Sequence, residues 1–176
     1  MAYEIIDNLL SDQEFDRIKN VMLGSEFPWF LNKEKVAPKS KAKFEDGTDA
    51  EIFNYQFIHM FYKDLAPSSE HINEVTPILN KLDLSALIRI KANLTMATPK
   101  KVIFGHHVDQ SNSPENLKTA VFYLNTTDGP TLFEDGLEVE CIENRLVVFD
   151  TNMPHSAVSH TDAKARCVIN FNFYKK

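Results

Sequence analysis

Hydrophobic and polar positions follow a helical period near the N-terminus. The stretch 11–14 fits a capping box, in which the Ser11 hydroxyl accepts from the backbone N–H of Glu14 and the Glu14 side chain reaches back to the N–H of Ser11. Gly24 stands where a C-terminal cap is expected. The pattern therefore predicts a helix over residues 12–23. Its apolar face consists of Phe15, Ile18, Val21 and Met22.

Three further patterns precede the middle of the chain. Residues 32–51 hold five lysines followed by four acidic residues and almost no large apolar side chain. This composition predicts a mobile loop, either a solvated surface excursion or a lid-like element that binds substrate, and both readings stay open. Residues 55–63 are aromatic and extended in character. Apolar residues in 68–82 recur at helical spacing, with Pro77 as an irregularity.

From residue 86 the chain changes to short runs rich in Val, Ile, Thr and Phe. About eight such runs alternate with turn-forming segments, which is typical of β-strands. The pattern predicts an α+β, mainly β, fold: a double-stranded β-helix, or jelly roll, of about eight strands with supporting N-terminal helices. We expect one domain over 1–176, in which 1–85 supply helical support and the lid-like loop and 86–176 form the jelly-roll core.

Composition narrows the class of protein. The hydrophobic fraction of 43% and charged fraction of 25% are those of a soluble globular protein. A net charge of −6 argues against a nucleic-acid partner, because such affinity comes from clustered Lys and Arg. The N-terminus shows neither a signal peptide nor a membrane span, so we expect a cytoplasmic protein, in the host cytoplasm if phage-encoded, with no membrane partner. The two cysteines, Cys141 and Cys167, are far apart and are expected to be buried free thiols.

Two adjacent histidines precede an aspartate in FGHHVDQSN, residues 104–112. Successive side chains of a strand point to opposite faces, so His107 and Asp109 share a face and His106 points away. A third ligand would complete the two-His-one-carboxylate triad that holds Fe(II). His155 follows Pro154 at the start of a later predicted strand and is the natural third ligand. Weaker alternatives are His59, His71 and His160.

Arg166 opens the last predicted strand, RCVINFNFY, which is otherwise apolar or neutral. A buried arginine is costly without an anionic partner, and its planar guanidinium pairs well with a carboxylate. Arg166 therefore fits the distal carboxylate of a dicarboxylic co-substrate. The alternative is a rim arginine paired with Asp162 or Glu143. Asn170 and Asn172 share the parity of Arg166 and are candidates for hydrogen bonds to co-substrate or substrate.

An ordered set of short motifs runs through the second half of the chain. It consists of His107-x-Asp109, YLN at 123–125, DGPTLF at 128–133, RLVVFD at 145–150, Pro154-His155 and Arg166. The set resembles the 2-oxoglutarate and Fe(II)-dependent dioxygenases, most of all the prolyl-4-hydroxylase-like branch and the small 2OG-Fe(II) oxygenases of phages and bacteria. The resemblance covers residues 86–174, and the opening YEIIDNLLSDQEFDRIK is similar to the helical support of that branch.

The resemblance implies roles for individual residues. The Fe(II) ligands, and so the catalytic centre, would be His107, Asp109 and His155. Arg166 would bind the C5 carboxylate of 2-oxoglutarate, joined by the hydroxyl of Tyr123.

The resemblance also implies further contacts to the co-substrate. Asn93 matches a position that often touches it, and Asn170 is a further candidate by parity. Thr131 stands in GPTLF where the family has a GGxTxF-like turn, a departure that leaves its role open.

The implied activity is hydroxylation of a substrate with consumption of O2 and 2-oxoglutarate and release of succinate and CO2, with ascorbate as an auxiliary reductant. The substrate would be a small molecule or a peptide or protein, and a prolyl residue is favoured by the resemblance alone. Residues 32–51, Trp29 and the loop 110–117 are expected at the mouth of the site, although Trp29 also fits a core anchor. Two alternatives remain: a jelly-roll metalloprotein with hydrolase or isomerase activity, and a non-catalytic binding module.

Overall fold

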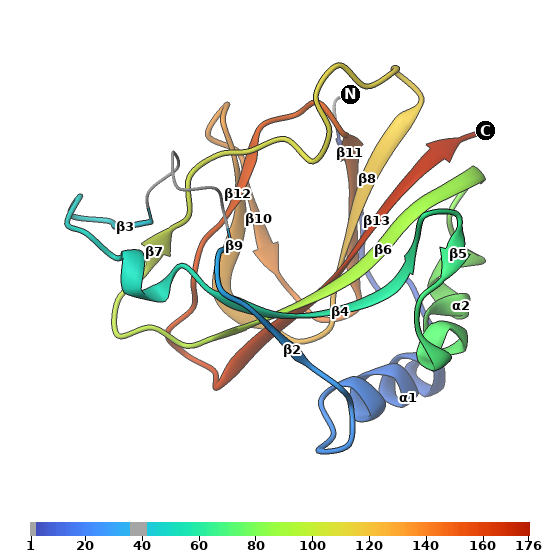
Figure 1. The fold of residues 1–176 in the computed structure, drawn as a ribbon, viewed down its shortest axis with the longest axis horizontal. Coiled ribbons are helices and arrows are strands. Elements are labelled where there is room, and N and C mark those ends of the chain that lie inside the picture. Colours follow the sequence, from blue (N-terminus) through green and yellow to red (C-terminus); the bar gives the residue numbers. More distant parts are fainter. Residues whose placement is uncertain (1–2, 36–41) are drawn as a thin grey trace.

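The computed structural model describes residues 3–35 and 42–176. Two groups of antiparallel strands face each other, as expected for a jelly roll (Figure 1). The large sheet consists of β1 (Tyr3–Ile6), β2 (Phe30–Asn32), β4 (Gln56–Lys63), β5 (Ala66–Pro67), β6 (Leu84–Met96), β8 (Leu117–Tyr123), β11 (Arg145–Asp150) and β13 (Ala165–Lys175). The opposite layer consists of β3 (Lys43–Phe44), β7 (Val102–Ile103), β9 (Thr127–Phe133), β10 (Glu138–Cys141) and β12 (His155–Ala157).

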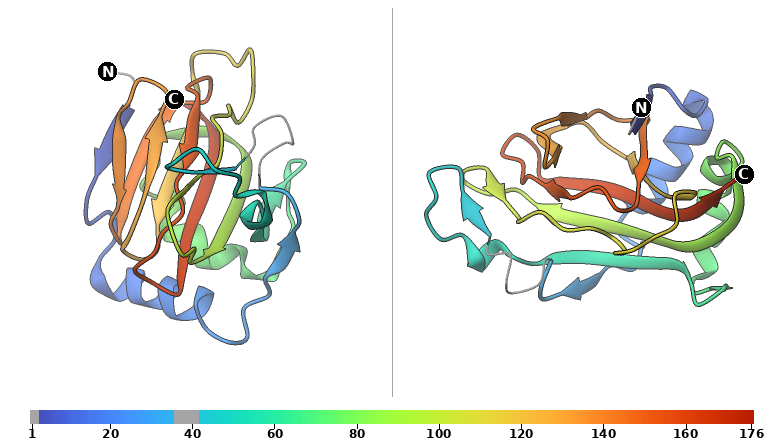
Figure 2. Two further views of the ribbon diagram at one scale, coloured as in Figure 1. Left: turned by 90° about the vertical axis from the view of Figure 1, so that its left-hand side faces the viewer. Right: turned by 90° about the horizontal axis from the view of Figure 1, so that it is seen from above.

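The strand order explains how distant segments meet. The large sheet runs β1-β11-β8-β13-β6-β4-β2, with β5 paired to β4, and the small sheet runs β10-β9-β12. The pair β3-β7 touches the small sheet through a bridge between Ile103 and Val158. The two longest strands, β6 and β13, lie side by side in the large sheet (Figure 2). The predicted jelly roll is confirmed.

The predicted first helix is confirmed as α1 (Asp12–Met22). Ser11 Oγ accepts from Glu14 N at 3.4 Å, and Glu14 Oε2 accepts from Ser11 N at 3.1 Å, so both halves of the capping box form. Gly24 does not adopt a left-handed conformation. A Cβ at this position would lie 2.8 Å from the carbonyl oxygen of Asn20, so the glycine is required by close backbone approach instead.

The second helical pattern forms two short helices instead of one. A 3-10 helix, η2 (Glu70–Val75), leads into α2 (Thr76–Leu79), where Pro77 occupies the first turn and its missing N–H loses no helical bond. Both α1 and α2 lie on the outer face of the large sheet (Figure 1). Ile18 and Ile78 are buried there with strand residues such as Phe122.

Alternation along the central strands creates two apolar layers. Phe122 and Ile169 face the helices, and their neighbours Val121 and Val168 face the space between the sheets. A strand buried on both faces reads as a continuous apolar run, as β8 does in the sequence. Because the helices cover the outer face, the inner face of these strands is available for a site.

The first 85 residues were expected to supply helical support and a lid-like loop. β1, β2 and β4 all belong to the large sheet, so the first 85 residues supply strands as well as support. β1 pairs with β11, which places the N-terminal segment at the edge of the sheet. These short pairings depend on partners far along the chain, which local periodicity cannot reveal.

Part of the polar segment 32–51 is folded. Ala42 and Ala50 are fully buried against Val102 and Phe104, and the 3-10 helix η1 (Glu51–Phe53) follows directly. The reading as a solvated excursion is therefore wrong for these residues. The part of the segment at 36–41 lies outside the described residues.

Trp29 and the cysteines occupy structural positions. Trp29 packs against the helix-facing core, and its Nε1 donates to the carbonyl of Met22 at 3.1 Å, so it anchors the end of α1 and does not stand at the mouth of a site. Cys141 and Cys167 are buried free thiols, as expected. Over the described ranges, no helix is long and apolar enough to cross a membrane.

Candidate metal centre and co-substrate pocket

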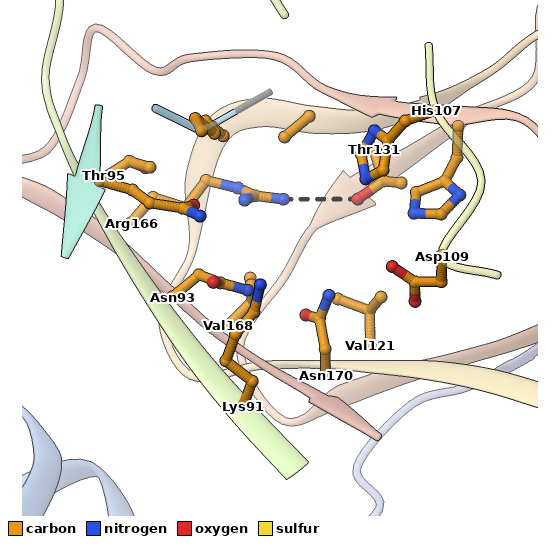
Figure 3. Close-up of a pocket in the computed structure, with 14 residues that line it drawn as sticks. Lys91, Asn93, Thr95, His107, Asp109, Val121, Thr131, Arg166, Val168 and Asn170 are labelled. Atoms are coloured by element: carbon orange, nitrogen blue, oxygen red, sulfur yellow. Dashed lines mark hydrogen bonds between the residues drawn. The ribbon is translucent and has the colours of Figure 1, made fainter. Parts of the chain in front are cut away.

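A pocket opens between the two sheets, on the inner face of the large one (Figure 3). Its floor comes from β4, β6, β8 and β13, and its opposite wall comes from β9, β12 and the segment after β7. The lining residues are Lys35, Gln56, Lys91, Asn93, Thr95, His107, Asp109, Val121, Thr131, His155, Ala157, Arg166, Val168 and Asn170.

Polar side chains at one parity of β6 and β13 form this floor. The antiparallel register places Arg166 opposite Thr95 and Asn170 opposite Lys91. Arg89, one step further along β6, stands opposite Asn172 and donates from Nε to its Oδ1 at 2.9 Å. The inward parity expected for Asn170 and Asn172 is therefore confirmed. A ladder of polar pairs in the middle of a buried sheet indicates a binding site, because such groups are costly to bury for packing alone.

His107, Asp109 and His155 form a cluster at one end of the pocket. One possible ligand atom from each of the three lies within 4.8 Å of the others. His107 and His155 are joined by an isolated antiparallel bridge, with N–H to carbonyl bonds of 2.9 Å in both directions. His106 is exposed and does not line the pocket. Two histidines and one carboxylate are the donor set of the facial triad that binds Fe(II).

His107 and Asp109 were expected on one face of a single strand, and this expectation is only partly correct. β7 ends at Ile103, so His107 and Asp109 do not lie on a continuous strand. The bridge to His155 supplies the extended geometry locally, and this one bridge is sufficient to direct His107 inward and His106 outward.

Three donors hold the carboxylate of Asp109. Asn172 Nδ2 and Thr119 Oγ1 donate to Oδ2 at 2.8 and 3.1 Å, and Arg89 Nη2 lies 3.3 Å from Oδ1. Burial opposes ionisation of Asp109, but Arg89, Asn172 and the two nearby histidines outweigh it and lower the pKa of Asp109. The carboxylate is therefore both charged and fixed in direction.

The two histidines of the cluster differ in their surroundings. His155 is buried, and its Nδ1 lies 3.0 Å from the carbonyl of Met153, which fixes the tautomer with the proton on Nδ1 and leaves Nε2 free to bind a metal. His107 is the most exposed of the triad. Burial of the rest of its ring, with the neighbouring His155, nevertheless lowers the pKa of His107 to about 4.

Arg166 enters the pocket from the start of β13. It is buried; its Nε donates to the carbonyl of Gly129 at 2.9 Å, and its Nη2 lies 3.4 Å from Thr131 Oγ1 (Figure 3). Across the described parts of the chain it forms no ion pair, and Glu143 pairs with Lys19 instead. The alternative of a rim arginine is therefore wrong. A buried guanidinium without a carboxylate requires an anion from outside the chain.

Tyr123 lies behind the pocket wall. Its hydroxyl donates to Thr131 Oγ1 at 2.8 Å, and the side chain is fully buried, which raises the pKa of Tyr123 to about 12. Thr131 thus accepts from both Tyr123 and Arg166, and its own proton remains to be donated into the pocket. The direct contact expected from Tyr123 stays a prediction, whereas Thr131 has a clear place beside Arg166.

The motif residues around Arg166 set its position. Asn125 of YLN donates from Nδ2 to Ala165 O and accepts from Cys167 N, both at 2.9 Å, which fixes the start of β13 on either side of Arg166. A Cβ on Gly129 would lie 2.8 Å from the carbonyl of Val158, so only glycine allows this close approach.

Several buried polar atoms in the pocket have no hydrogen-bond partner within 3–35 and 42–176. They are Lys35 Nζ, Asn93 Oδ1, Thr95 Oγ1 and Asn170 Oδ1. Buried polar groups in native proteins are nearly always satisfied, so a cluster of unsatisfied ones marks where a polar ligand binds. Asn93 and Asn170 therefore line the pocket with an unsatisfied Oδ1 each, and their contact with a co-substrate stays a prediction.

The other histidines do not join the cluster. His59 is part of β4, where its ring nitrogens contact Pro28 O and Ser69 Oγ, both at 2.8 Å, and its ring packs edge-to-face with that of His71. His160 is buried, and neither it nor His59 nor His71 lines the pocket.

Five polar residues in or beside the pocket were not predicted from the sequence: Lys35, Lys91, Arg89, Thr95 and Thr119. Four alternating polar positions on β6, in RIKANLT, carried a readable signal, because Arg89, Lys91, Asn93 and Thr95 occupy one face of a strand whose other positions are apolar. No local pattern marks Lys35, which reaches the pocket from the segment after β2.

Several solved structures have a fold similar to that of this chain. No protein-family model and no curated protein sequence matches the chain. A prolyl hydroxylase from Trichoplax adhaerens, in complex with a peptide fragment of the hypoxia inducible factor oxygen degradation domain, has 13% identity and a TM-score of 0.66 over 99% of this chain and 84% of that one.

Two further structures are similar. A 2OG-Fe(II) oxygenase family oxidoreductase from Burkholderia pseudomallei has 10% identity and a TM-score of 0.66, over 99% of this chain and 86% of that one. HygX from Streptomyces hygroscopicus, with nickel and 2-oxoglutarate bound, has 8% identity and a TM-score of 0.57, over 99% and 83%. The chain therefore has the jelly-roll fold that is seen in these 2OG-Fe(II) oxygenases.

Proposed function

We propose that the protein is an Fe(II)- and 2-oxoglutarate-dependent dioxygenase that hydroxylates its substrate, and that residues 1–176 form one such domain. The observation that carries the proposal is the pairing of a His-Asp-His cluster with a buried, unpaired arginine in one pocket. The fold shared with 2OG-Fe(II) oxygenases supports it.

The residues present fit the metal. His107, Asp109 and His155 would hold Fe(II) on one side, which leaves positions open toward the pocket. The hydrogen bonds to Asp109 and His155 orient these two ligands before a metal binds.

The residues also fit a dicarboxylate. Arg166 would pair with the distal carboxylate of 2-oxoglutarate, and the hydroxyl of Thr131 would donate a further hydrogen bond. Asn93 and Thr95 would offer their unsatisfied groups along the length of the co-substrate. Bound Fe(II), 2-oxoglutarate and O2 together supply the oxidation of a substrate C–H bond to C–OH, with release of succinate and CO2.

The protein's own part is to position these groups and exclude water. The apolar residues Val121, Val168 and Ala157 line the pocket between the polar ones and would limit the water around a bound co-substrate. A peptidyl proline remains a candidate substrate, supported by the prolyl hydroxylase among the similar structures.

The second candidate function, a hydrolase or isomerase with the same metal triad, has less support. Such an enzyme needs no clamp for a second carboxylate, whereas Arg166 is buried beside the metal cluster with no carboxylate partner in the described residues. A non-catalytic module would not need the three oriented donors around Asp109.

Calorimetric titration of 2-oxoglutarate into the Zn(II)-loaded protein tests the proposal. We expect saturable binding, weakened about thirtyfold or more by Arg166→Met, because a desolvated charge pair contributes 2 kcal/mol or more. Arg17→Met removes an exposed arginine that pairs with Glu74 and should leave the affinity unchanged. Equal affinities for wild type and Arg166→Met would contradict the proposal.

A further inference from the structure

Two lysines face the same pocket as the metal cluster and Arg166, and neither has an anionic partner among residues 3–35 and 42–176. They are Lys35, three residues after β2, and Lys91, in the middle of β6. Neither lysine forms an ion pair within 4 Å in these parts of the chain. Lysine is almost never buried without a partner, so the two positions require an explanation.

Lys35 is fixed in place by its backbone. Its N–H donates to the backbone carbonyl and to Oδ1 of Asn54, both at 3.2 Å. Its Nζ lies 3.7 Å from the ring centroid of Phe104, which is a cation–π contact. This contact directs the ammonium group inward but provides no hydrogen-bond acceptor atom. Nζ is buried without a hydrogen-bond partner in the described chain.

The charged groups that act on Lys35 are both positive. Burial lowers the pKa of Lys35 well below its usual value, and Arg166 and Lys91 lower it further. The six residues that follow, VAPKSK at 36–41, contain no acidic side chain, so their sequence offers no counter-charge.

Lys91 lies on the pocket floor formed by β6. Burial lowers the pKa of Lys91, with a further decrease from Arg89 and an opposing increase from Asp109. Asp109, however, is already occupied by Arg89, Asn172 and Thr119. Lys91 points into the open centre of the pocket beside Asn93 (Figure 3).

The formal charges of the proposed reactants show what is missing. This step rests on the proposed function. The positive charges of Fe(II) and Arg166 together balance the negative charges of Asp109 and 2-oxoglutarate. Lys35 and Lys91 then remain without an anionic partner in the pocket, whereas Arg89 is paired with Asp109. An anionic group on a ligand would stabilise the protonated forms of both lysines, which burial disfavours in the free protein.

We propose that Lys35 and Lys91 bind an anionic group of the substrate, a carboxylate or a phosphate, while Arg166 holds 2-oxoglutarate. The substrate is then an acidic compound or an acidic residue, with its anionic group close to the carbon that is oxidised. A neutral prolyl side chain would leave both lysines unpaired, so this inference separates the protein from prolyl hydroxylation.

Ligand-observed NMR on the Zn(II)- and 2-oxoglutarate-saturated protein tests the inference, since Zn(II) is diamagnetic and supports no turnover. The probes are acetate, methyl phosphate and the neutral acetamide. We expect saturation transfer to acetate or methyl phosphate but not to acetamide. Lys35→Met and Lys91→Met should each lower the affinity for the anion about tenfold or more. The matched control Lys33→Met changes an exposed lysine of the same segment and should have no effect.

A second readout separates a binding role from a structural one. Removing an unpaired buried charge should raise the midpoint of thermal unfolding of the ligand-free Lys35→Met variant, whereas loss of a structural contact would lower it. Calorimetry of the same variants should show 2-oxoglutarate affinity within about threefold of wild type, since Arg166 is intact.

The outcomes are distinguishable. A response to acetate alone assigns a carboxylate substrate, and a response to methyl phosphate alone assigns a phosphorylated one. Three results would overturn the inference: the wild type binds neither anion, acetamide binds as well as the anions, or the lysine variants lose affinity for 2-oxoglutarate and keep their affinity for the anion. If the protein binds no 2-oxoglutarate at all, the proposed function fails, and titration of the anions into the Zn(II)-loaded protein still tests the two lysines.

Discussion

Asn172 donates a 2.8 Å hydrogen bond from Nδ2 to Oδ2 of Asp109, across 63 residues of sequence. The bond connects the far part of β13 to a proposed metal ligand on the segment after β7 and fixes the direction of the carboxylate. Asn172→Ala should therefore weaken Zn(II) binding about tenfold, the low end of the effect of losing a partner of a metal ligand. Competition with a chromogenic chelator measures this. Asn80→Ala, an exposed position beyond α2, is the control, and an unchanged affinity in Asn172→Ala would show that the bond is incidental.

The adjacent histidines should differ in function. His107→Ala removes one of three proposed ligands and should lower Zn(II) affinity about a hundredfold or more, whereas His106→Ala, an exposed side chain outside the pocket, should change it less than about twofold. Both affinities come from the same chelator competition. Equal losses in the two variants would mean that the bridge between His107 and His155 does not define the inward face.

Tyr123 should act through Thr131. Tyr123→Phe removes the hydroxyl that donates to Thr131 Oγ1, and loss of this hydrogen bond costs about 1 kcal/mol. The affinity for 2-oxoglutarate should therefore fall about fivefold, and the affinity for Zn(II) should not change. Calorimetry with each ligand separates the two effects. Tyr174→Phe, on the same sheet near the C-terminus, is the control. A parallel loss of metal affinity would indicate general disorder of the pocket instead.

Asn144 joins the N-terminal segment to the turn before β11. It has a positive φ of 59°, its Oδ1 accepts from Leu10 N at 3.0 Å, and its Nδ2 donates to Leu10 O at 2.9 Å. Asn144→Ala loses both bonds and strains the backbone, so the free energy of unfolding in urea should fall by about 3 kcal/mol. Asn144→Asp keeps the bond to Leu10 N and tolerates the same φ, so it should lose about half as much. A loss below about 1 kcal/mol in Asn144→Ala would contradict this view of the turn.

Local chemistry made part of the fold predictable. The start of α1 follows from Ser11 and Glu14 alone, because a capping box involves residues three apart. β1 and β2 were not predictable in the same way, because each is a short edge strand whose only support is a partner more than twenty residues away.

The candidate site was likewise predictable only in part. His107, Asp109, His155 and Arg166 come together as the ordered motifs suggested. The side chains around them, such as Arg89 on Asp109 and Thr131 on Arg166, depend on strand register that no single segment encodes. Lys35 is the extreme case, since its sequence context is that of a solvated loop while its ammonium is buried.

The central claim is that one pocket holds both Fe(II) and 2-oxoglutarate. Absorption spectroscopy of the protein under anaerobic conditions, with Fe(II) and then 2-oxoglutarate added, tests it most directly, because chelation of Fe(II) by the keto acid gives a weak visible charge-transfer band. We predict that the band appears with the wild-type protein, disappears in His107→Ala, and requires about thirtyfold or more 2-oxoglutarate in Arg166→Met. Absence of the band from the wild-type protein, or an identical 2-oxoglutarate dependence in Arg166→Met, would contradict the claim.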